Sequence, residues 1–287
     1  MAAKFGPAGL DEIFYAEGGK SSAEAPSFLR RKNLDAFEYQ CTRGVKISES
    51  LARKLGDEAR NSGVSLSIHG PYYINFCSGE AQIRANSCGY VMSSLEAAHW
   101  MGAEVVVFHP GQAGKKPRAE ALEMISAGLM RCIEQASKKG FAHIKLAPET
   151  GGKKSAFGGL DEIIALAKLH PQIIPCVDFA HLHAREGGCL NTEEDFDRIL
   201  DALLYGLGES KVKNLHCHFS PIEFTAAGEK RHWTTLETQF GPDFLPLARS
   251  FVKKNIEPTV ICESNGRQSA DAQLYRDMYR AASGKFI

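Results

Sequence analysis

The sequence predicts an α/β fold, a single (β/α)8 TIM barrel formed by residues 1–287, and three observations support this prediction. The length of 287 residues lies within the range that one such barrel occupies. Apolar runs rich in β-branched residues alternate with segments of helical periodicity along the whole chain. Several of these runs lead directly into polar turn residues, and in a barrel such loops form the face that carries the active site.

Eight candidate strands recur at intervals along the chain. They are Lys4 to Gly9, Phe37 to Cys41, Leu66 to His69, Val105 to His109, Ile144 to Ala147, Ile173 to Val177, Val212 to Cys217 and Pro258 to Cys262. The segments between them predict helices, among them Ser48 to Ser62, Asn86 to Gly102, Ala119 to Gly140, Leu160 to Leu169 and Thr192 to Leu204. Nearly continuous apolar strands separated by amphipathic helices are typical of a parallel sheet covered on both faces, and eight such units close into a barrel.

The composition limits the class of protein. With 44% hydrophobic and 24% charged residues the chain can bury a sizeable core, and it has no apolar run long enough to span a membrane. The amino terminus, MAAKFGPAGLDEIF, lacks the features of a secretion signal, so we expect a cytoplasmic protein, and we expect a monomer. Eight cysteines without a CxxC pair argue against a zinc ribbon or a disulfide framework. The formal net charge of zero means that any binding of a polyanion would be local.

One titratable side chain stands at the end of each of six consecutive predicted strands. These side chains are His69, His109, Glu149, Asp178, His216 and Glu263. Because the carboxyl ends of the strands meet at one mouth of a barrel, three imidazoles and three carboxylates should face one another there. Carboxylates crowded in a partly desolvated cleft destabilise a fold unless cations neutralise them. The sequence therefore predicts a divalent metal cluster at this mouth.

The types of ligand narrow the choice of metal. Nitrogen and oxygen donors without thiolate suit Zn²⁺, and also Mn²⁺ or Fe²⁺, and six ligands exceed what one four-coordinate Zn²⁺ can use. Two ions bridged by a carboxylate fit better, and two ions about 3.5 to 4 Å apart are the usual arrangement for hydrolysing phosphate esters. The alternative is a polar, hydrogen-bonded barrel mouth, because a single histidine at a strand end is more often a core residue than a ligand.

Seven segments resemble, in their order and spacing, the endonuclease IV family of apurinic/apyrimidinic endonucleases. They are HGPYYINF (69–76), FHPG (108–111), PETGG (148–152), DFAH (178–181), LHCHFS (215–220), KRH (230–232) and ES (263–264). Members of that family are (β/α)8 barrels with three zinc ions that cleave the phosphodiester 5′ to an abasic site. The resemblance implies that His69 and His109 hold one ion and that Glu149 bridges it to a second. The other ligands of the second ion would be Asp178, His216 and Glu263.

The third ion site departs from the family pattern. The resemblance gives His181 and His232 as ligands, but Lys230 stands where the family has an aspartate. A charged lysine is no ligand and repels a dication. Glu229 could replace the aspartate through a shifted loop, or the site could be depleted so that two ions remain, and we favour the depleted site. Lys230 and Arg231 could then bind a substrate phosphate, the alternative being a solvated loop tip.

Three further residues are candidates for substrate contacts. Tyr72 and Asn75 follow His69 at positions where the family motif has a tyrosine and an asparagine, and Arg43 follows the second strand, where the family inserts a loop that contacts DNA. A tyrosine beside the metals could stack on the opened sugar site or bond a phosphate, or it could pack against the barrel.

We interpret the chain as a metal-dependent phosphodiesterase of base excision repair, with double-stranded DNA containing abasic sites as its partner. Glu149 or Glu263 would orient the hydroxide that attacks phosphorus, without a covalent enzyme intermediate. The abasic nucleotide would have to rotate out of the helix to reach a recessed cluster.

Two other functions stay open. A sugar isomerase or epimerase on the related xylose isomerase-like barrel would use four of the same positions as ligands of one ion, Glu149, Asp178, His216 and Glu263. A metal-bound nucleic-acid sensor without activity is the third possibility. His69 together with His109 favours the nuclease, because this pair supplies a second ion that an epimerase does not need.

Overall fold

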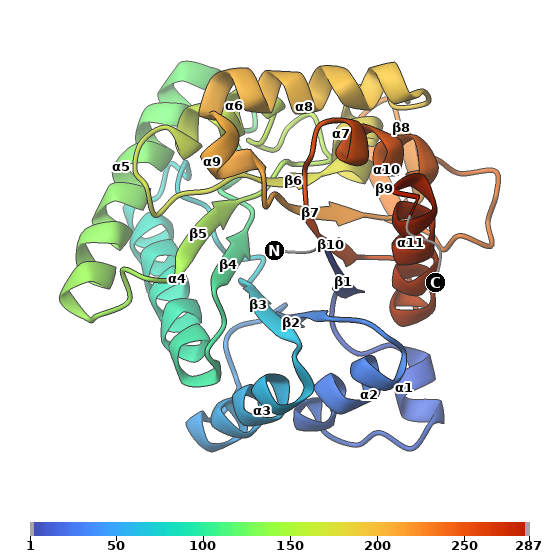
Figure 1. Cartoon of the computed structure of the whole chain (residues 1–287). Helices are drawn as coiled ribbons and strands as arrows, with labels where there is room; N and C mark the ends of the chain where they lie inside the picture. The colour runs from blue at the N-terminus through green and yellow to red at the C-terminus, as the bar shows by residue number, and fades with distance from the viewer. Residues whose placement is uncertain (1–2, 285–287) are drawn as a thin grey trace.

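Eight parallel strands form a ring surrounded by helices (Figure 1) in the computed structural model of the chain, which describes residues 3–284. The first two and last three residues of the predicted domain lie outside the described residues. The strands are β1 (Lys4–Pro7), β2 (Ala36–Gln40), β3 (Ser65–His69), β4 (Val105–Phe108), β5 (Lys145–Pro148), β6 (Cys176–Asp178), β7 (His216–Phe219) and β10 (Thr259–Cys262). The predicted (β/α)8 barrel is confirmed.

The ring closes through two four-stranded sheets. One has the order β1-β10-β7-β6 and the other β2-β3-β4-β5. A parallel bridge between Ala8 and Glu38 joins β1 to β2, and bridges from Glu149 to Cys176 and from Leu146 to Ile173 join the strands on the other side. All carboxyl ends of the strands therefore open at one mouth, as a barrel requires.

The helices begin and end where the sequence provides caps. The hydroxyl of Ser48 accepts a hydrogen bond from the Leu51 amide at the start of α3, and Gly63 ends that helix with a φ of 66°. The helices are α1 (Glu12–Ala16), η1 (Ser22–Glu24), α2 (Ala25–Arg31), α3 (Glu49–Ser62), α4 (Ala81–Met101), α5 (Arg118–Lys138), α6 (Leu160–Ala167), α7 (Phe179–Arg185), α8 (Glu193–Leu207), α9 (Glu209–Val212), α10 (Phe244–Lys253) and α11 (Gln268–Ala282). Within residues 3–284, none of these helices combines the length and the apolar character needed to cross a bilayer.

The seventh barrel strand differs from its predicted range. Val212, expected to begin that strand, is the last residue of α9 and is buried there. The strand begins at His216 and continues to Phe219, two residues beyond its predicted end. An apolar residue on the buried face of a short helix was thus mistaken for the start of a strand, and this shift in register affects the site.

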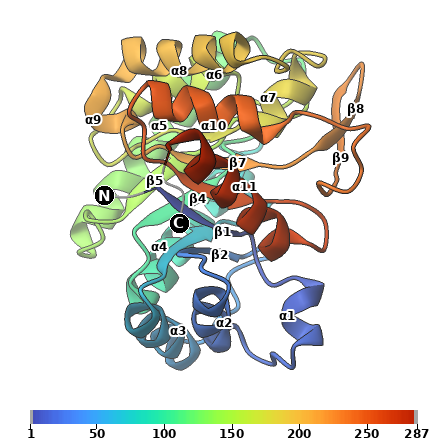
Figure 2. The same cartoon turned by 45° about the vertical axis from the view of Figure 1, so that its right-hand side comes forward.

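A β-hairpin follows β7, which the sequence pattern did not predict. Its strands β8 (Ile222–Thr225) and β9 (Gly228–His232) pair antiparallel, and the hairpin projects at the edge of the barrel (Figure 2). Gly228 has a φ of 101° and lies against the backbone of Gly152, so a side chain there would meet the loop after β5. This close approach holds the hairpin over the barrel mouth.

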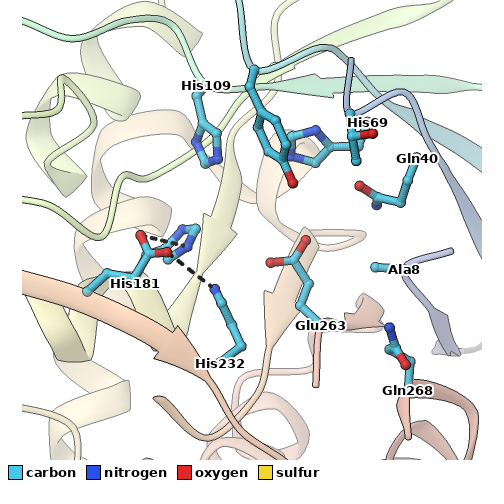
Figure 3. A pocket seen from close by; sticks show the side chains of 11 residues that line it. Ala8, Gln40, His69, His109, His181, His232, Glu263 and Gln268 are labelled. Atoms are coloured by element: carbon cyan, nitrogen blue, oxygen red, sulfur yellow. Dashed lines mark ion pairs between the residues drawn. The ribbon is translucent and has the colours of Figure 1, made fainter. Parts of the chain in front are cut away.

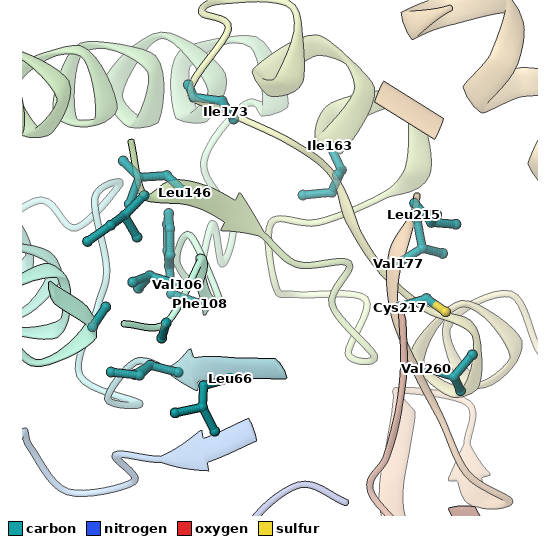
Figure 4. Close-up of a cluster of buried hydrophobic side chains, with 14 of the residues drawn as sticks. Leu66, Val106, Phe108, Leu146, Ile163, Ile173, Val177, Leu215, Cys217 and Val260 are labelled. Carbon is teal, nitrogen blue, oxygen red and sulfur yellow. The ribbon is translucent and has the colours of Figure 1, made fainter. Parts of the chain in front are cut away.

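Alternate residues of the strands face two different environments. The outward residues, such as Leu66, Val106, Leu146, Val177 and Val260, pack with helix residues in one large apolar core (Figure 4). The residues next to them point into the barrel, because side chains of a strand alternate between its two faces. There Val107, Ala147 and Cys176 form a small apolar cluster, and Glu38, Ser67 and His216 are buried polar residues. The metal-ligand candidates stand above this inner layer.

Gly6 tests the closure of the ring between β1 and β2. A β-carbon at this position would lie 1.7 Å from the backbone oxygen of Ala36, so the two strands could not keep their spacing. We expect Gly6→Ala to lower the free energy of unfolding by about 3 kcal/mol or more in urea titrations. Gly79→Ala is the matched control, because a β-carbon there meets no atom within 4 Å. Equal stability of the two variants would contradict this account of the closure.

Candidate metal centre

A cavity of about 300 Å³ opens at the mouth of the barrel, above the carboxyl ends of the strands. His69 on β3, His181 on α7, His232 on β9 and Glu263 after β10 face the cavity (Figure 3). Gln40, Ala8 and Gln268 lie on one side of it. The complete lining is Ala8, Gln40, Thr42, His69, Tyr72, His109, His181, Glu229, His232, Glu263 and Gln268. The cavity thus combines a side rich in imidazole and carboxylate with a side of uncharged residues.

The first group of donors is His69, His109 and Glu149, whose ligand atoms lie within 4.8 Å of one another. Oε2 of Glu149 is 3.0 Å from Nε2 of His69 and 3.4 Å from Nδ1 of His109. Burial and the neighbouring imidazole of His69 lower the pKa of His109 to about 4, against the attraction of Glu149. His109 is therefore neutral at neutral pH, the state in which an imidazole can bind a metal.

The second group contains Glu149, Asp178, His218 and Glu263, again with ligand atoms within 4.8 Å. Nδ1 of His218 lies 3.2 Å from Glu149 and 3.3 Å from Glu263. Burial raises the pKa of Glu263 to about 7, with further contributions from Glu149 and Asp178. Burial would also raise the pKa of Glu149, but His109 and His218 hold it well below its usual range. Three carboxylates share this volume, and a cation would relieve their repulsion.

The prediction that His216 belongs to this group is wrong. His216 is the first residue of β7, and its Nε2 lies 2.9 Å from Glu38 in the inner layer of the barrel. His218, two residues later, reaches the mouth instead. Both histidines face inward because strand side chains alternate, and only the observed register shows which one is at the top.

The third group contains Asp178, His181, His232 and Glu263, with ligand atoms within 4.8 Å. Glu229 extends this group. Its carboxylate lies 3.6 Å from Nε2 of His181 and 3.8 Å from Nε2 of His232, the contacts drawn as dashed lines in Figure 3. A carboxylate therefore stands where the depleted site was expected to have none.

A β-bulge explains how Glu229 takes this place. In the hairpin, Glu223 pairs with Arg231 and Phe224 with Glu229, so Lys230 is an extra residue without a partner in the register. Residues three apart on a regular strand point to opposite faces, but one extra residue lets Glu229 and His232 share a face. Lys230 points outward and forms an ion pair of 2.5 Å with Glu223. The lysine therefore does not occupy the position of the missing aspartate.

The predicted substrate residues lie in different surroundings. Tyr72 lines the cavity and is 64% exposed, so it is free to contact a ligand. Arg43 is exposed on the loop after β2, next to the cavity-lining Thr42. Arg231 is exposed and its guanidinium lies 4.3 Å from the ring centre of Trp233.

The predicted substrate contact of Asn75 is not supported. Its side-chain oxygen accepts hydrogen bonds from the backbone amide of Gln112 and the thiol of Cys77. The backbone amide of Asn75 donates to the hydroxyl of Ser87. Asn75 does not line the cavity. It instead connects the loops after β3 and β4.

The orientation of the histidines fits a bound metal. Nδ1 of His69 lies 2.9 Å from the backbone oxygen of Gly70, and Nδ1 of His181 lies 3.0 Å from that of Thr150. A carbonyl oxygen only accepts, so each Nδ1 carries a proton, and Nε2 is the ring nitrogen that faces the carboxylates of the centre. This is the pattern of metal-binding histidines, whose outer nitrogen is held by a protein acceptor.

Two further observations agree with this fit. Oδ2 of Asp178 is buried and has no hydrogen-bond partner among the described residues, although Oδ1 accepts from the His181 amide. A buried carboxylate oxygen without a partner is costly, and a cation would satisfy it. A β-carbon at Gly152 would lie 2.6 Å from the Glu229 carboxylate and 2.8 Å from the His181 ring. The absence of a side chain at Gly152 makes room for both donors.

Several residues of the site were not singled out from the sequence. Gln40, Thr42 and Gln268 line the uncharged side of the cavity, and Glu38 lies beneath it. The only sequence signal for Glu38 is a charged residue inside a predicted strand. Gln40 ends β2, Thr42 follows it and Gln268 begins α11, and uncharged polar residues at such positions carry no signal without the fold.

Comparison with known proteins identifies the family of the chain and proteins that are similar to it. A family model described as xylose isomerase-like TIM barrel matches residues 27–282. An uncharacterised protein of Methanocaldococcus jannaschii is 33% identical over 88% of this chain and 91% of its own length. A probable endonuclease 4 of Acholeplasma laidlawii is 26% identical over 65% of this chain, a match that spans 62% of that protein.

Solved structures of two kinds of protein have the same fold. Endonuclease IV from Thermus thermophilus has a TM-score of 0.69 at 20% identity, covering 91% of this chain and 94% of that one. A D-tagatose 3-epimerase-like protein has a TM-score of 0.75 at 18% identity, covering 98% of both chains. At such identities the likeness concerns the fold, and the chemistry has to be argued from the site.

Removal of metal tests the donor cluster as a whole. Chelator-treated protein should be less stable than untreated protein, because the crowded carboxylates then lack a counter-charge. Titration with Zn²⁺ should raise the free energy of unfolding by about 2.7 kcal/mol once free ion reaches roughly 100 times its Kd. Protein treated with zinc-saturated chelator is the control. Urea curves that no divalent ion shifts would contradict a metal centre.

Proposed function

The chain belongs to the xylose isomerase-like TIM barrel family, and from this premise we propose that it is a metal-dependent phosphodiesterase that cleaves DNA 5′ to abasic sites. The observation that carries the proposal is the extent of the donor cluster. Glu149 belongs to the first and second groups, and Asp178 and Glu263 belong to the second and third. Together the three groups contain more donors than one four-coordinate ion can use. A cluster of two or three ions is the arrangement suited to phosphate ester hydrolysis.

We assign the ligands of the proposed ions from the three groups. His69, His109 and Glu149 would hold the first ion, and Glu149 would also be within reach of the second. The second ion would take Asp178, His218 and Glu263. The third would take His181, His232 and Glu229. Zn²⁺ suits these nitrogen and oxygen donors best, with Mn²⁺ or Fe²⁺ as substitutes. When bound, such ions supply positive charge for a phosphate and lower the pKa of water.

The positions of the two glutamates indicate which of them activates the attacking water. Glu263 opens onto the cavity, whereas Glu149 is fully buried beneath it, so Glu263 is the carboxylate that can orient an attacking water and accept its proton. The water oxygen forms a bond to phosphorus, and the bond from phosphorus to the 3′ oxygen of the preceding nucleotide breaks. That oxygen takes up a proton and leaves as a hydroxyl, and the phosphate stays on the abasic nucleotide.

Three loops at the mouth supply a site for a polyanion in a chain without net charge. Residues 41–48, 109–117 and 149–159 follow β2, β4 and β5 and contain six lysines and arginines. Their only acidic residue is Glu149, which points to the centre. The six are Arg43, Lys46, Lys115, Lys116, Lys153 and Lys154. Basic side chains gathered around a cavity favour a phosphate backbone.

Because the donors lie deep in the cavity, a nucleotide must leave the double helix to reach them. The donors lie at the ends of the strands, below the loops, so a nucleotide inside a duplex could not reach them without leaving the helix. An abasic nucleotide has no base to unpair or unstack, and it therefore rotates out more easily. Tyr72, exposed at the cavity edge, is placed to contact the sugar or its phosphate.

A sugar epimerase is the second candidate function. Glu149, Asp178, His218 and Glu263 alone would make a four-ligand site for one ion, and the epimerase-like structure covers 98% of the chain. The donors beyond these four, on β3, the loop after β4, and the β8–β9 hairpin, have no use in a single-ion site. They favour the phosphodiesterase.

The third ion can be tested with two neighbouring variants. Glu229→Gln should bind one ion fewer than the wild type, because the amide weakens a site that also depends on His181 and His232. Lys230→Gln should keep the full number, because Lys230 faces Glu223 and not the centre. Elemental analysis after removal of excess ion measures both. A loss of metal in the lysine variant alone would overturn the assignment.

Incision of a duplex that carries one abasic site tests the proposed reaction. Protein of known metal content should cut 5′ to the site and stop when a chelator is added. Glu149→Gln should lower the rate by on the order of 10³-fold or more, since two ions share this carboxylate. The same variant, purified in parallel, controls for contaminating nuclease. Epimerisation of a ketohexose by protein with one ion and no incision would establish the second candidate instead.

A further inference from the structure

A buried carboxylate lies directly beneath the metal centre, and we propose that Glu38 is the positioning residue that orients His218 as a metal ligand. The inference rests on the proposed function, since it concerns a ligand of the same centre. Glu38 comes from β2. The strands β3 to β7 each provide an assigned ligand at or next to their carboxyl end, and β2 does not. Glu38 reaches His218 from across the inside of the barrel.

Glu38 is completely buried and held by several donors. Ser67 on β3 donates from its hydroxyl to Oε2 at 2.9 Å, and Nε2 of His216 lies 2.9 Å from the same oxygen. The other oxygen, Oε1, lies 3.0 Å from Nε2 of His218. Two neighbours thus fix one carboxylate oxygen while the second faces the ring of His218. A carboxylate fixed in this way cannot swing out of reach.

His218 has one nitrogen on each side of the boundary between the two layers. Nδ1 faces Glu149 and Glu263 in the metal centre, at 3.2 and 3.3 Å. Nε2 lies 3.0 Å from Oε1 of Glu38 below, but the angle between the two groups does not meet the criteria of a hydrogen bond. A proton on Nε2 would be attracted by Glu38 and would leave the lone pair of Nδ1 for an ion.

The partner of His218 differs from those of three other histidines in the cluster. His69 and His181 contact backbone oxygens with their outer nitrogens, and Nδ1 of His232 lies 2.7 Å from the hydroxyl of Ser220. These partners are neutral. Among these four histidines, only His218 faces a carboxylate outside the metal centre, and such a carboxylate raises the basicity of the ring more than a neutral acceptor does.

The energetics of burial support a positioning role. An unpaired carboxylate inside the barrel would cost several kcal/mol, so its retention there needs a compensating interaction. The contacts of Ser67, His216 and His218 with its two oxygens, at 2.9 to 3.0 Å, supply that interaction. The two oxygens of Glu38 are therefore directed at the two imidazole rings.

The inner layer could instead be considered as a separate metal site. Cys176, His216 and His218 offer ligand atoms within 4.8 Å of one another. However, the Nε2 atoms of both histidines already face the oxygens of Glu38 at 2.9 and 3.0 Å. Glu38 thus already faces both nitrogens without an ion, and the ion count distinguishes the two possibilities.

Metal titration of Glu38→Gln tests the proposal without reference to activity. The amide keeps the shape of the side chain but removes its charge, so the affinity for Zn²⁺ in competition with a chromophoric chelator should fall by about 10- to 100-fold. The number of ions at saturation should not change. The visible absorption of the Co²⁺-loaded protein should also change, because His218 would no longer be held in one orientation.

Asp271→Asn is the matched control, because Asp271 is a fully buried carboxylate that binds Thr235 instead of a ligand. It should lower the melting temperature and leave Zn²⁺ affinity and the Co²⁺ spectrum unchanged. Should Glu38→Gln prove too unstable, Ser67→Ala, which removes one support of Glu38, should show a smaller loss of affinity.

The outcomes separate this inference from the proposed function. Wild-type affinity and an unchanged Co²⁺ spectrum in Glu38→Gln, with a wild type that binds two or three ions, would overturn the role of Glu38 alone. Loss of one ion in both Glu38→Gln and Cys176→Ser would also overturn it and would indicate a metal site in the inner layer. A wild type without any bound ion would refute the metal centre and this inference with it.

Discussion

The carboxylate of Glu149 is the group on which the arrangement of the barrel mouth depends. It is completely buried and lies within 3.4 Å of the ring nitrogens of four histidines, those of residues 69, 109, 181 and 218. Asp178 and Glu263 crowd the same volume. Such a concentration of negative charge is tolerable only with protons on the imidazoles or with cations between the groups. The need to neutralise these carboxylates therefore applies to the donors of several strands at once.

The support for this centre is built in layers from the strands upward. Period-two alternation places apolar side chains between strands and helices, and polar side chains together with a small apolar cluster inside the barrel. Within the barrel, Glu38, Ser67 and His216 form a satisfied layer below, and the donors of the candidate centre form the layer above. The loops after β2, β4 and β5 carry six lysines and arginines at this end of the barrel. The chemistry at the mouth therefore depends on which residue of each strand is the last to face inward.

The barrel could be predicted from sequence because alternating strands and helices leave few other folds open to a chain of this length. The position of His69 and Glu149 at the barrel mouth could be predicted for the same reason, and their role as metal ligands stays a prediction. The position of His216 was predicted wrongly, because two inward-facing histidines on one strand differ only in height. Cytoplasmic location and a monomeric state stay predictions.

Glu229 and Glu38 depend on features that a sequence pattern does not contain. The position of Glu229 requires a bulge at Lys230, which is a property of the pairing between β8 and β9. The position of Glu38 requires the closed ring, because its partners come from β3 and β7. Non-local contacts of this kind become visible only when the strands are in register.

Zinc-edge anomalous diffraction from crystals grown with Zn²⁺ tests the central claim most directly. The account predicts separate anomalous peaks, one beside His69 and His109, one beside Asp178 and His218, and one beside His181, His232 and Glu229. A single peak among Glu149, Asp178, His218 and Glu263 would contradict the multi-ion centre, and with it the argument for phosphodiester cleavage.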